Sequence, residues 1–229
     1  MDLRVELPEA VNIQTLEKIH DKIRDTYPIS KKRVLFEGRM SAGDQVLASA
    51  KQTHLGIAFY SADNLHVFQA RRDGFSFSRL APYDTWENLR DEAKRHWSLY
   101  KRTVSPLHID RIALRYINEI SIPGPRIDFD DYFLTIPKIG SQLPQALSKF
   151  IMQLHVPQPD LDAHVILTQT MQTGPSPDGA ISVILDIDTF IEQKQMSEPE
   201  AWAAIEALRV RKNDFFEGCI TDRARELFY

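Results

Sequence analysis

The sequence predicts an α+β protein with antiparallel sheets and helices packed on them. Between residues 32 and 80, short runs of aromatic and β-branched side chains alternate with polar ones, as antiparallel strands do. Segments 84–102 and 197–215 instead repeat apolar side chains at helical spacing. The order strand, helix, meander and long helix occurs twice, which predicts a duplicated strand-helix-meander-helix unit.

The composition narrows the class of protein. The chain has 229 residues, 43% of them hydrophobic, and is long enough to bury a sizeable core. It contains no apolar run of about 18 residues, and its N-terminus lacks the pattern of a secretory signal. The single cysteine, Cys219, excludes an intramolecular disulfide, so we expect a cytoplasmic protein. The net charge of −4 argues against nucleic-acid binding.

The first helix is expected to begin at Asn12, a favoured N-cap residue, and to end before Pro28. Its apolar side chains recur at helical spacing: Leu16, Ile19, Ile23 and Tyr27. The strands of the following meander are separated by residue pairs typical of turns: Gly43–Asp44, Asp63–Asn64 and Asp73–Gly74.

A second helix follows, with Asp84 as the predicted N-cap and Glu87 completing a capping box. One face of this helix carries Trp86, Leu89, Ala93, Trp97 and Tyr100. Two tryptophans on one apolar stripe favour burial in the core over stacking on a ligand.

The second half is predicted to begin with a long strand over 108–122. The remaining elements are expected to be a short helix near 143–151, strands at 163–173 and 180–188 joined by a turn at 174–179, a long helix from Ser197 and a short helix from Thr221. Trp86 and Trp202 lie at comparable points of the two long helices. We therefore predict a first α+β unit over residues 1–104 and a second over 105–229, packed as one compact domain.

Charged residues alternate in two of the predicted strands. Arg111 and Arg115 share the mixed face of one strand, and Asp186 and Asp188 share a face of another. Bidentate pairing of arginine with carboxylate favours one ion-pair network made of these four residues. Two alternatives stay open. One is an anion site around the arginines, and the other is a Mg²⁺ or Mn²⁺ site at the aspartates, as used in phosphoryl transfer.

No complete catalytic arrangement is found in the sequence. The histidines form no H-E-x-x-H pattern, and neither a P-loop nor a G-x-S-x-G motif is present. Cys219 lacks a neighbouring histidine that would activate it. His54, His66, His108 and His164 lie in or near strands and could meet in space. We therefore assign no catalytic residue, no metal site and no cofactor.

An apolar segment after the strand at 108–122 is interrupted by Pro137, Gly140 and Pro144. It presents a candidate interaction surface made of Phe129, Tyr132, Phe133 and Leu134. Packing of this segment over the core is the favoured alternative.

Three segments resemble a sporadically distributed bacterial family of uncharacterised conserved hypothetical proteins: RLAPYDTWENL, RIALRYINEI and ILDIDTF. The resemblance extends to RVRKNDFFEGCIT, and thus over nearly the whole chain. It implies no activity. The scattered distribution of the family is similar to that of phage-defence and toxin–antitoxin systems, which is an analogy and not an argument from a site.

These observations favour a non-enzymatic binding protein with a protein partner, and neither a membrane nor a nucleic acid is expected to bind. The alternative is a metal-dependent phosphoryl- or nucleotide-processing enzyme that uses Asp186 and Asp188. The two hypotheses differ in whether these aspartates face an open cleft or accept hydrogen bonds from arginine.

Overall fold

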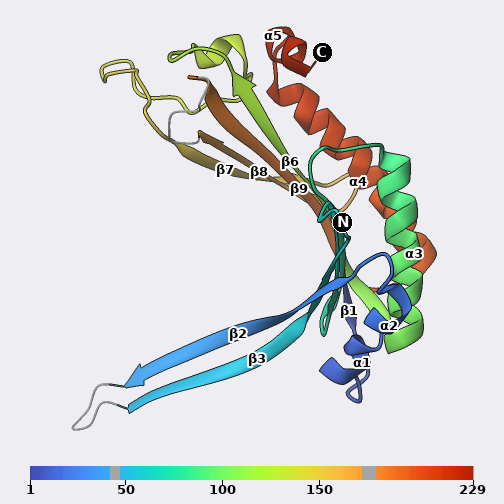
Figure 1. Ribbon diagram of the computed structural model, residues 1–229. Helices are drawn as coiled ribbons and strands as arrows, with labels where there is room; N and C mark the ends of the chain where they lie inside the picture. Colours follow the sequence, from blue (N-terminus) through green and yellow to red (C-terminus); the bar gives the residue numbers. More distant parts are fainter. Residues whose placement is uncertain (42–46, 172–178, 229) are drawn as a thin grey trace. The chain divides into compact units, whose positions relative to one another are not determined.

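The computed structural model describes residues 1–41, 47–171 and 179–228. Within these residues, nine strands form an antiparallel sheet in the order β2-β3-β4-β5-β1-β6-β9-β8-β7, and helices accompany it (Figure 1). The predicted α+β class is confirmed. The chain divides into two compact units: unit 1 comprises Met1–Ile112 and Gln193–Glu198, and unit 2 comprises Ala113–Glu192 and Pro199–Tyr229. The division falls inside strand β6 (His108–Ile122).

Unit 1 contains the predicted meander. Strands β2 to β5 pair antiparallel in sequence order, and β1 pairs antiparallel with β5. The elements are β1 (Asp2–Glu6), α1 (Ile13–Glu17), α2 (His20–Ile23), β2 (Ile29–Ser41), β3 (Leu47–Tyr60), β4 (His66–Arg71), β5 (Gly74–Arg79) and α3 (Trp86–Val104).

The predicted first helix is present as two short helices, α1 and α2. Asn12 caps α1 as predicted, because its side chain accepts a hydrogen bond from the backbone N–H of Thr15. The N–H of Ile19 bonds to the carbonyl of Leu16, three residues back, and this tighter turn interrupts the α-helical pattern. The four apolar residues of the predicted stripe are nevertheless all buried.

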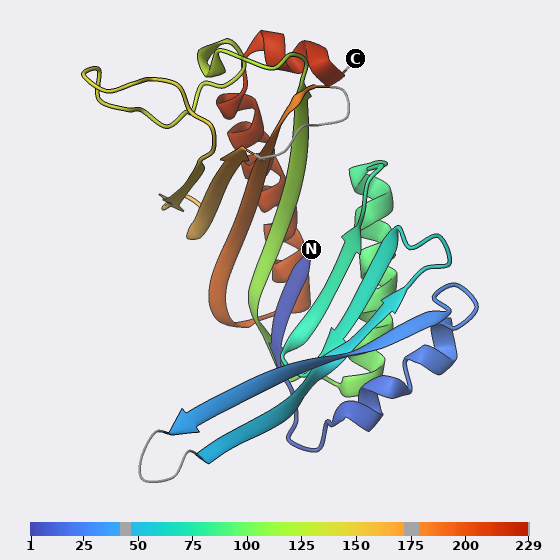
Figure 2. The same cartoon turned by 60° about the vertical axis from the view of Figure 1, so that its left-hand side comes forward.

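Strands β2 and β3 extend beyond the rest of the meander as a two-stranded ribbon. Residues 56–60 of β3 pair with β4, whereas residues 47–54 pair with β2 alone. Figure 2 shows the ribbon that results. At the branch point, a Cβ on Gly56 would lie 2.3 Å from the carbonyl oxygen of Ala70. Only glycine therefore fits where these strands approach so closely.

Helix α3 has the buried stripe that the sequence predicts, but a different N-cap. Trp86, Leu89, Ala93, Trp97 and Tyr100 are all buried, and the rings of Trp97 and Tyr100 contact Phe75 of β5. The cap is Thr85 and not Asp84, because the Thr85 hydroxyl accepts from the N–H of Asn88. The carboxylate of Asp84 instead accepts from the side-chain amide of Asn88.

In unit 2, every second residue is buried along Ala163–Met171 and along Val183–Ile191. Its elements are the later part of β6 (His108–Ile122), η1 (Phe129–Asp131), β7 (Ile151–Gln158), β8 (Ala163–Met171), most of β9 (Ile181–Met196), most of α4 (Glu198–Cys219), α5 (Asp222–Arg225) and η2 (Glu226–Phe228). The strand at 108–122 and the short helix after Thr221 agree with the predictions. Thr221 caps α5 through the N–H of Ala224.

The helix predicted near 143–151 is wrong. Residues 143–150 form no helix, and strand β7 begins at Ile151. Gly140 and Pro144 disfavour a helix here. Pro157 made the following segment unlike a typical strand, because proline is rare within strands. Proline is accepted in β7 because this strand is at an edge of the sheet. The predicted turn at 174–179, apart from Gly179, and the turn at Gly43–Asp44 lie outside the described residues.

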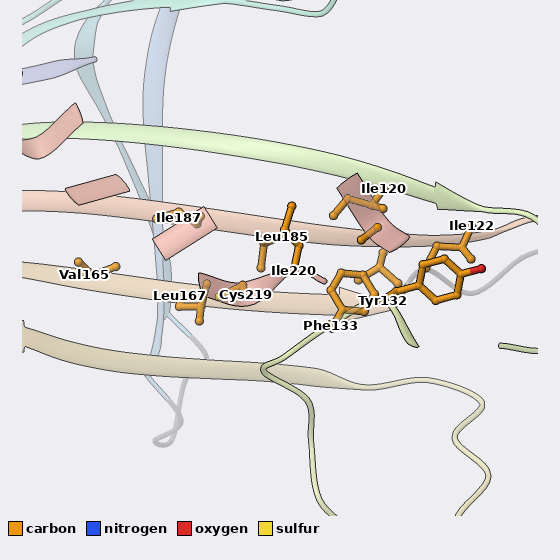
Figure 3. Close-up of a cluster of buried hydrophobic side chains, with 12 residues drawn as sticks. Ile120, Ile122, Tyr132, Phe133, Val165, Leu167, Leu185, Ile187, Cys219 and Ile220 are labelled. Carbon is orange, nitrogen blue, oxygen red and sulfur yellow. The ribbon is translucent and has the colours of Figure 1, made fainter. Parts of the chain in front are cut away.

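The core of unit 2 joins residues of β6, β8 and β9 to the segment after η1 and to the end of α4 (Figure 3). Its buried members are Ile120, Ile122, Tyr132, Phe133, Val165, Leu167, Val183, Leu185, Ile187, Cys219, Ile220 and Ala224. Burial raises the pKa of the Cys219 thiol, although a hydrogen bond with Thr135 opposes the shift. This cysteine is therefore a packing residue.

The prediction of an interaction surface at 129–134 is corrected by the structure, because this segment packs onto the core. Tyr132 and Phe133 are buried within it, Phe129 packs against it, and only Leu134 is exposed. Backbone hydrogen bonds hold the segment in place: the Leu134 N–H bonds to Cys219 and the Thr221 N–H bonds to Tyr132. Because the backbone is paired on both sides, the aromatic rings are turned into the core.

None of the helices in the described part of the chain is both long enough and apolar enough to cross a membrane.

Candidate functional site

Arg115 and Asp186, on the neighbouring strands β6 and β9, form an ion pair. Arg115 donates from Nε to Asp186 Oδ1 at 2.8 Å and from Nη2 to Oδ2 at 2.5 Å. The hydrogen bond with Asp186 raises the pKa of Arg115, burial opposes the shift, and the charges of Asp186 and Asp188 add to it. This pair is one of those that the sequence predicts. Both oxygens of Asp186 accept hydrogen bonds from Arg115.

Arg111 belongs to unit 1, where it meets a carboxylate that the sequence analysis did not consider. Its Nη1 lies 3.6 Å from Oδ1 of Asp2, on strand β1. Asp2 also accepts from Arg71 at 2.5 Å. The alternating charges of β1 were the available signal, because Asp2 stands next to a buried Leu3 in a short strand.

Unit 1 has a solvent-accessible pocket of about 460 Å³ at the N-terminal end of α3. Its walls come from the start of β4, the end of β5 and the first three turns of α3. The lining residues are His66, Arg79, Asp84, Thr85, Asn88, Leu89, Asp91, Glu92 and Arg95.

A hydrogen-bond network centred on Glu92 lies at this pocket. Oε1 of Glu92 accepts from the Tyr27 hydroxyl at 2.8 Å and from Arg95 at 2.8 Å. Since the only hydroxyl proton of Tyr27 points to Glu92, the tyrosine oxygen accepts from Nε2 of His96, 2.9 Å away. This order assigns the Nε2–H tautomer to His96. The buried histidine ring also lies against Phe68 and Phe77.

The network fixes the protonation state of each member. Interaction with His96, followed by the hydrogen bond from Tyr27, lowers the pKa of Glu92 to about 2 despite its partial burial. Burial and the neighbouring Glu92 raise the pKa of Tyr27. Burial lowers the pKa of His96, against the opposing effect of Glu92. At neutral pH the site thus holds a carboxylate, a neutral phenol and a neutral imidazole.

Arg79 differs from the other arginine of the pocket. It faces His66 across β4 and β5, and its Nη1 lies 3.1 Å from Nε2 of that histidine. Its Nε is buried without a hydrogen-bond partner, and in the described part of the chain no carboxylate lies within 4.0 Å of the guanidinium. Asp63 interacts electrostatically with Arg79 only at longer range, so none of the described carboxylates forms a direct ion pair with this guanidinium.

A second pocket of unit 1, about 430 Å³, lies between the helices α1 and α2 and the strands β2 and β3. Its main charges are paired: Lys32 with Glu17 at 2.7 Å and Arg24 with Asp21 at 2.8 Å. Lys18 also lines this pocket and has no carboxylate within 4.0 Å among the described residues, but its side chain is exposed to solvent. The buried, unpartnered Nε of Arg79 makes the pocket at α3 the better candidate site.

Sequence reasoning identified Tyr27 as a core residue but missed its partners. The spacing of Glu92 and His96, four residues apart on α3, was a signal that these two side chains share a face. Tyr27, however, is 65 residues away from Glu92 in the chain. No local pattern brings these two residues together.

No family model, curated protein or solved structure matches this chain. The candidate site is therefore identified from the geometry and chemistry of the chain itself.

Proposed function

We propose that the chain is a non-enzymatic binding protein, and that the pocket at α3 receives one anionic group of a protein partner. The observation that carries this proposal is Arg79. A guanidinium with a buried, unpartnered Nε, at the wall of a pocket, is suited to pair with a carboxylate. His66 stands beside it as a second hydrogen-bonding group.

The pKa shifts support binding over acid–base catalysis. A general acid or base is most effective when its pKa lies near the working pH. Glu92, with a pKa of about 2, is a weak base, while the raised pKa of Tyr27 makes it a weak acid. The lowered pKa of His96 keeps it neutral, and its ring is buried. These groups hold a fixed arrangement of charge and exchange no proton near neutral pH.

The charges of the pocket indicate a single anionic group and not an extended acidic surface. Each of the lining carboxylates already has a partner: Asp84 accepts from Asn88, Asp91 from Arg90 and Glu92 from Arg95. They would repel a strongly acidic ligand but leave room for one carboxylate next to Arg79. An acidic side chain or the C-terminal carboxylate of a partner protein has this chemistry.

The alternative enzyme, with a metal at Asp186 and Asp188, has no specific observation in its favour, because Arg115 occupies both oxygens of Asp186. A role in a phage-defence or toxin–antitoxin system stays a prediction from the resemblance.

The proposal is tested by titrating the ¹⁵N-labelled chain with acetate and with N-acetyl-glutamate methylamide, followed by NMR. We expect saturable shifts confined to the amides around His66, Arg79 and the start of α3. Arg79→Ala should abolish them, whereas Arg72→Ala, which removes an exposed arginine of the same unit, should not. Shifts that are absent, or equal in both variants, would contradict an anion site at Arg79.

We also infer that the chain is a duplicated unit. In unit 1 the first strand, β1, lies beside the last strand of the meander, β5, and the long helix α3 follows in sequence. In unit 2 the strand β6 lies beside the last meander strand, β9, and the long helix α4 follows. Superposition of the two units tests the inference, and matched elements that run in different directions would refute it.

A further inference from the structure

Three potential metal ligands meet at the end of β1 and the beginning of β6, within unit 1 and outside the pocket at α3. Nε2 of His108 lies 3.1 Å from Oε2 of Glu6 and 3.4 Å from Oδ1 of Asp110. One ligand atom from each residue lies within 4.8 Å of the others. The sequence had singled out His108 only as one of several histidines in strands.

Strand pairing brings these residues together. β1 and β6 are neighbours in the sheet, and the N–H of Leu107 donates to the carbonyl of Glu6 at 2.9 Å. His108 and Asp110 are two residues apart in β6, so their side chains leave the same face, opposite to the buried Ile109. The ligand atoms are therefore held by strands and not by loops.

The charges of the cluster are unbalanced without a cation. In the described part of the chain, His108 is the only basic group within 4.0 Å of either Glu6 or Asp110. Its one nitrogen, Nε2, stands between both carboxylates, and a single N–H cannot point at two acceptors with good geometry. Among the described side chains, the two carboxylates thus share one donor, Nε2 of His108, and Asp110 also accepts from the backbone N–H of Gln195. A divalent cation bound at this point would satisfy both carboxylates and the imidazole lone pair.

We propose that Glu6, His108 and Asp110 bind a divalent transition-metal ion, with Zn²⁺ as the ion of reference. Bonds of about 2.0–2.2 Å at tetrahedral or octahedral angles place neighbouring ligand atoms roughly 3.0–3.5 Å apart. The distances from His108 to the two carboxylates fall in this range. The imidazole favours zinc, copper, iron or nickel over calcium and magnesium, which prefer oxygen ligands.

One contact outside the cluster orients a ligand. The backbone N–H of Gln195 donates to Oδ1 of Asp110 at 3.2 Å. Hydrogen bonds of this kind hold ligating carboxylates in position and are typical of metal sites. With three protein ligands, the ion keeps at least one coordination position for water.

Calorimetric titration of the full chain with ZnCl₂, and absorption spectra with CoCl₂, test the site without reference to any activity. We expect one ion per chain and visible cobalt bands of a bound, desolvated ion. His108→Gln and Asp110→Asn should each weaken binding more than tenfold, while His155→Gln, a change at an exposed histidine of unit 2, should leave it unchanged.

Glu6→Gln keeps the test decisive if the other variants fail to fold, because Glu6 is exposed at the end of its strand. It should weaken zinc binding and, with a chelator present, raise the Tm of the apo chain by removing carboxylate repulsion. If wild type binds no zinc, or if all variants including Glu6→Gln bind it equally, the cluster is a hydrogen-bonded ion pair only and the proposal is wrong. Neither result bears on the pocket at α3.

Discussion

Glu92 is the residue on which most of the candidate site depends. Its carboxylate accepts hydrogen bonds from Tyr27 and Arg95 and lies 3.5 Å from His96. Groups from two parts of unit 1, the segment after α2 and helix α3 itself, therefore favour its ionised form. The positions of the charged and polar groups around the pocket therefore depend on the side chain of Glu92. Substitution of Glu92 should therefore change the free energy of unfolding, which can be measured without a ligand.

Acid unfolding should reveal Glu92. Its pKa falls from 4.5 to about 2 in the folded chain. Because the folded value is below the unfolded value, the stabilisation is complete above pH 4.5 and is lost as the pH falls from 4.5 to about 2. Wild type should lose on the order of 2 kcal/mol more than Glu92→Gln across this window, after allowance for solvent screening.

Urea unfolding at a series of pH values measures this difference. Glu87→Gln is the matched control, because it removes an exposed glutamate of the same helix. A Glu92→Gln profile parallel to that of wild type would contradict the network.

Trp86 is predicted to be a packing residue of unit 1, and the structure buries it to 4% exposure. Trp86→Ala should therefore cost about 3–5 kcal/mol of unfolding free energy, because it leaves a large cavity. Leu107→Ala removes an exposed apolar side chain and should change stability by less than about 0.5 kcal/mol. Equal unfolding midpoints in urea for both variants would show that the indole is not part of the core.

At the scale of elements, the start of α3 combines structural and functional roles. Thr85 caps the helix and also lines the pocket, next to Asp84 and Asn88. The position of the cap thus sets which side chains of the first turn reach the pocket.

Thr85→Ala should cost about 1 kcal/mol, because one N–H of the first turn loses its acceptor. Asp84→Ala should cost less, since Asp84 accepts only from a side chain in the exposed turn. Thermal unfolding of the two variants shows which of the two residues caps the helix. A larger loss in Asp84→Ala would restore the capping box that the sequence predicted.

The pair of Arg115 and Asp186 links two long strands, and a double-mutant cycle measures its contribution. Asp186 is 14% exposed and Arg115 is 55% exposed, so solvent screens the arginine. Asp186→Ala should therefore destabilise unit 2 by on the order of 1–2 kcal/mol, less than a fully buried pair. Arg115→Ala combined with Asp186→Ala should cost less than the sum of the single variants.

The same series tests the alternative function. If Mg²⁺ or Mn²⁺ raised the Tm of wild type and Asp186→Ala lost this increase, the metal-dependent enzyme would be the better hypothesis.

At the scale of the whole molecule, unit 1 is discontinuous in sequence. Residues 193–198 belong to it although they follow the strands of unit 2. They supply the hydrogen bond from Gln195 to Asp110 and the 2.5 Å ion pair between Lys101 and Glu198. The later segment of the chain therefore completes the earlier unit.

A fragment of residues 1–112 should consequently be less stable than unit 1 in the full chain. We expect faster amide hydrogen exchange at the C-terminal end of α3 and along the first part of β6, because these segments lose their partners. Exchange rates that match those of the full chain would show that residues 193–198 contribute nothing to the unit.

The sequence by itself determined the local elements of this protein. The period of the apolar residues identified the meander, the buried face of α3 and the stripe that includes Tyr27, because each pattern spans only a few turns or residues. The sequence-based prediction was wrong at 143–151, where the apolar residues follow neither a helical nor a strand period. It was also wrong at the N-cap of α3, because Asp84 and Thr85 are neighbours that could both serve as the cap.

Only the tertiary structure decided which polar residues meet. Glu92 reaches Tyr27, and Glu6 reaches His108, through the packing of α3 and the pairing of β1 with β6. Asp2, not considered beforehand, pairs with Arg111 for the same reason. Strand register and helix packing depend on the whole core. In the strands, a register shift of one residue would turn side chains such as Glu6, His108 and Asp2 to the opposite face.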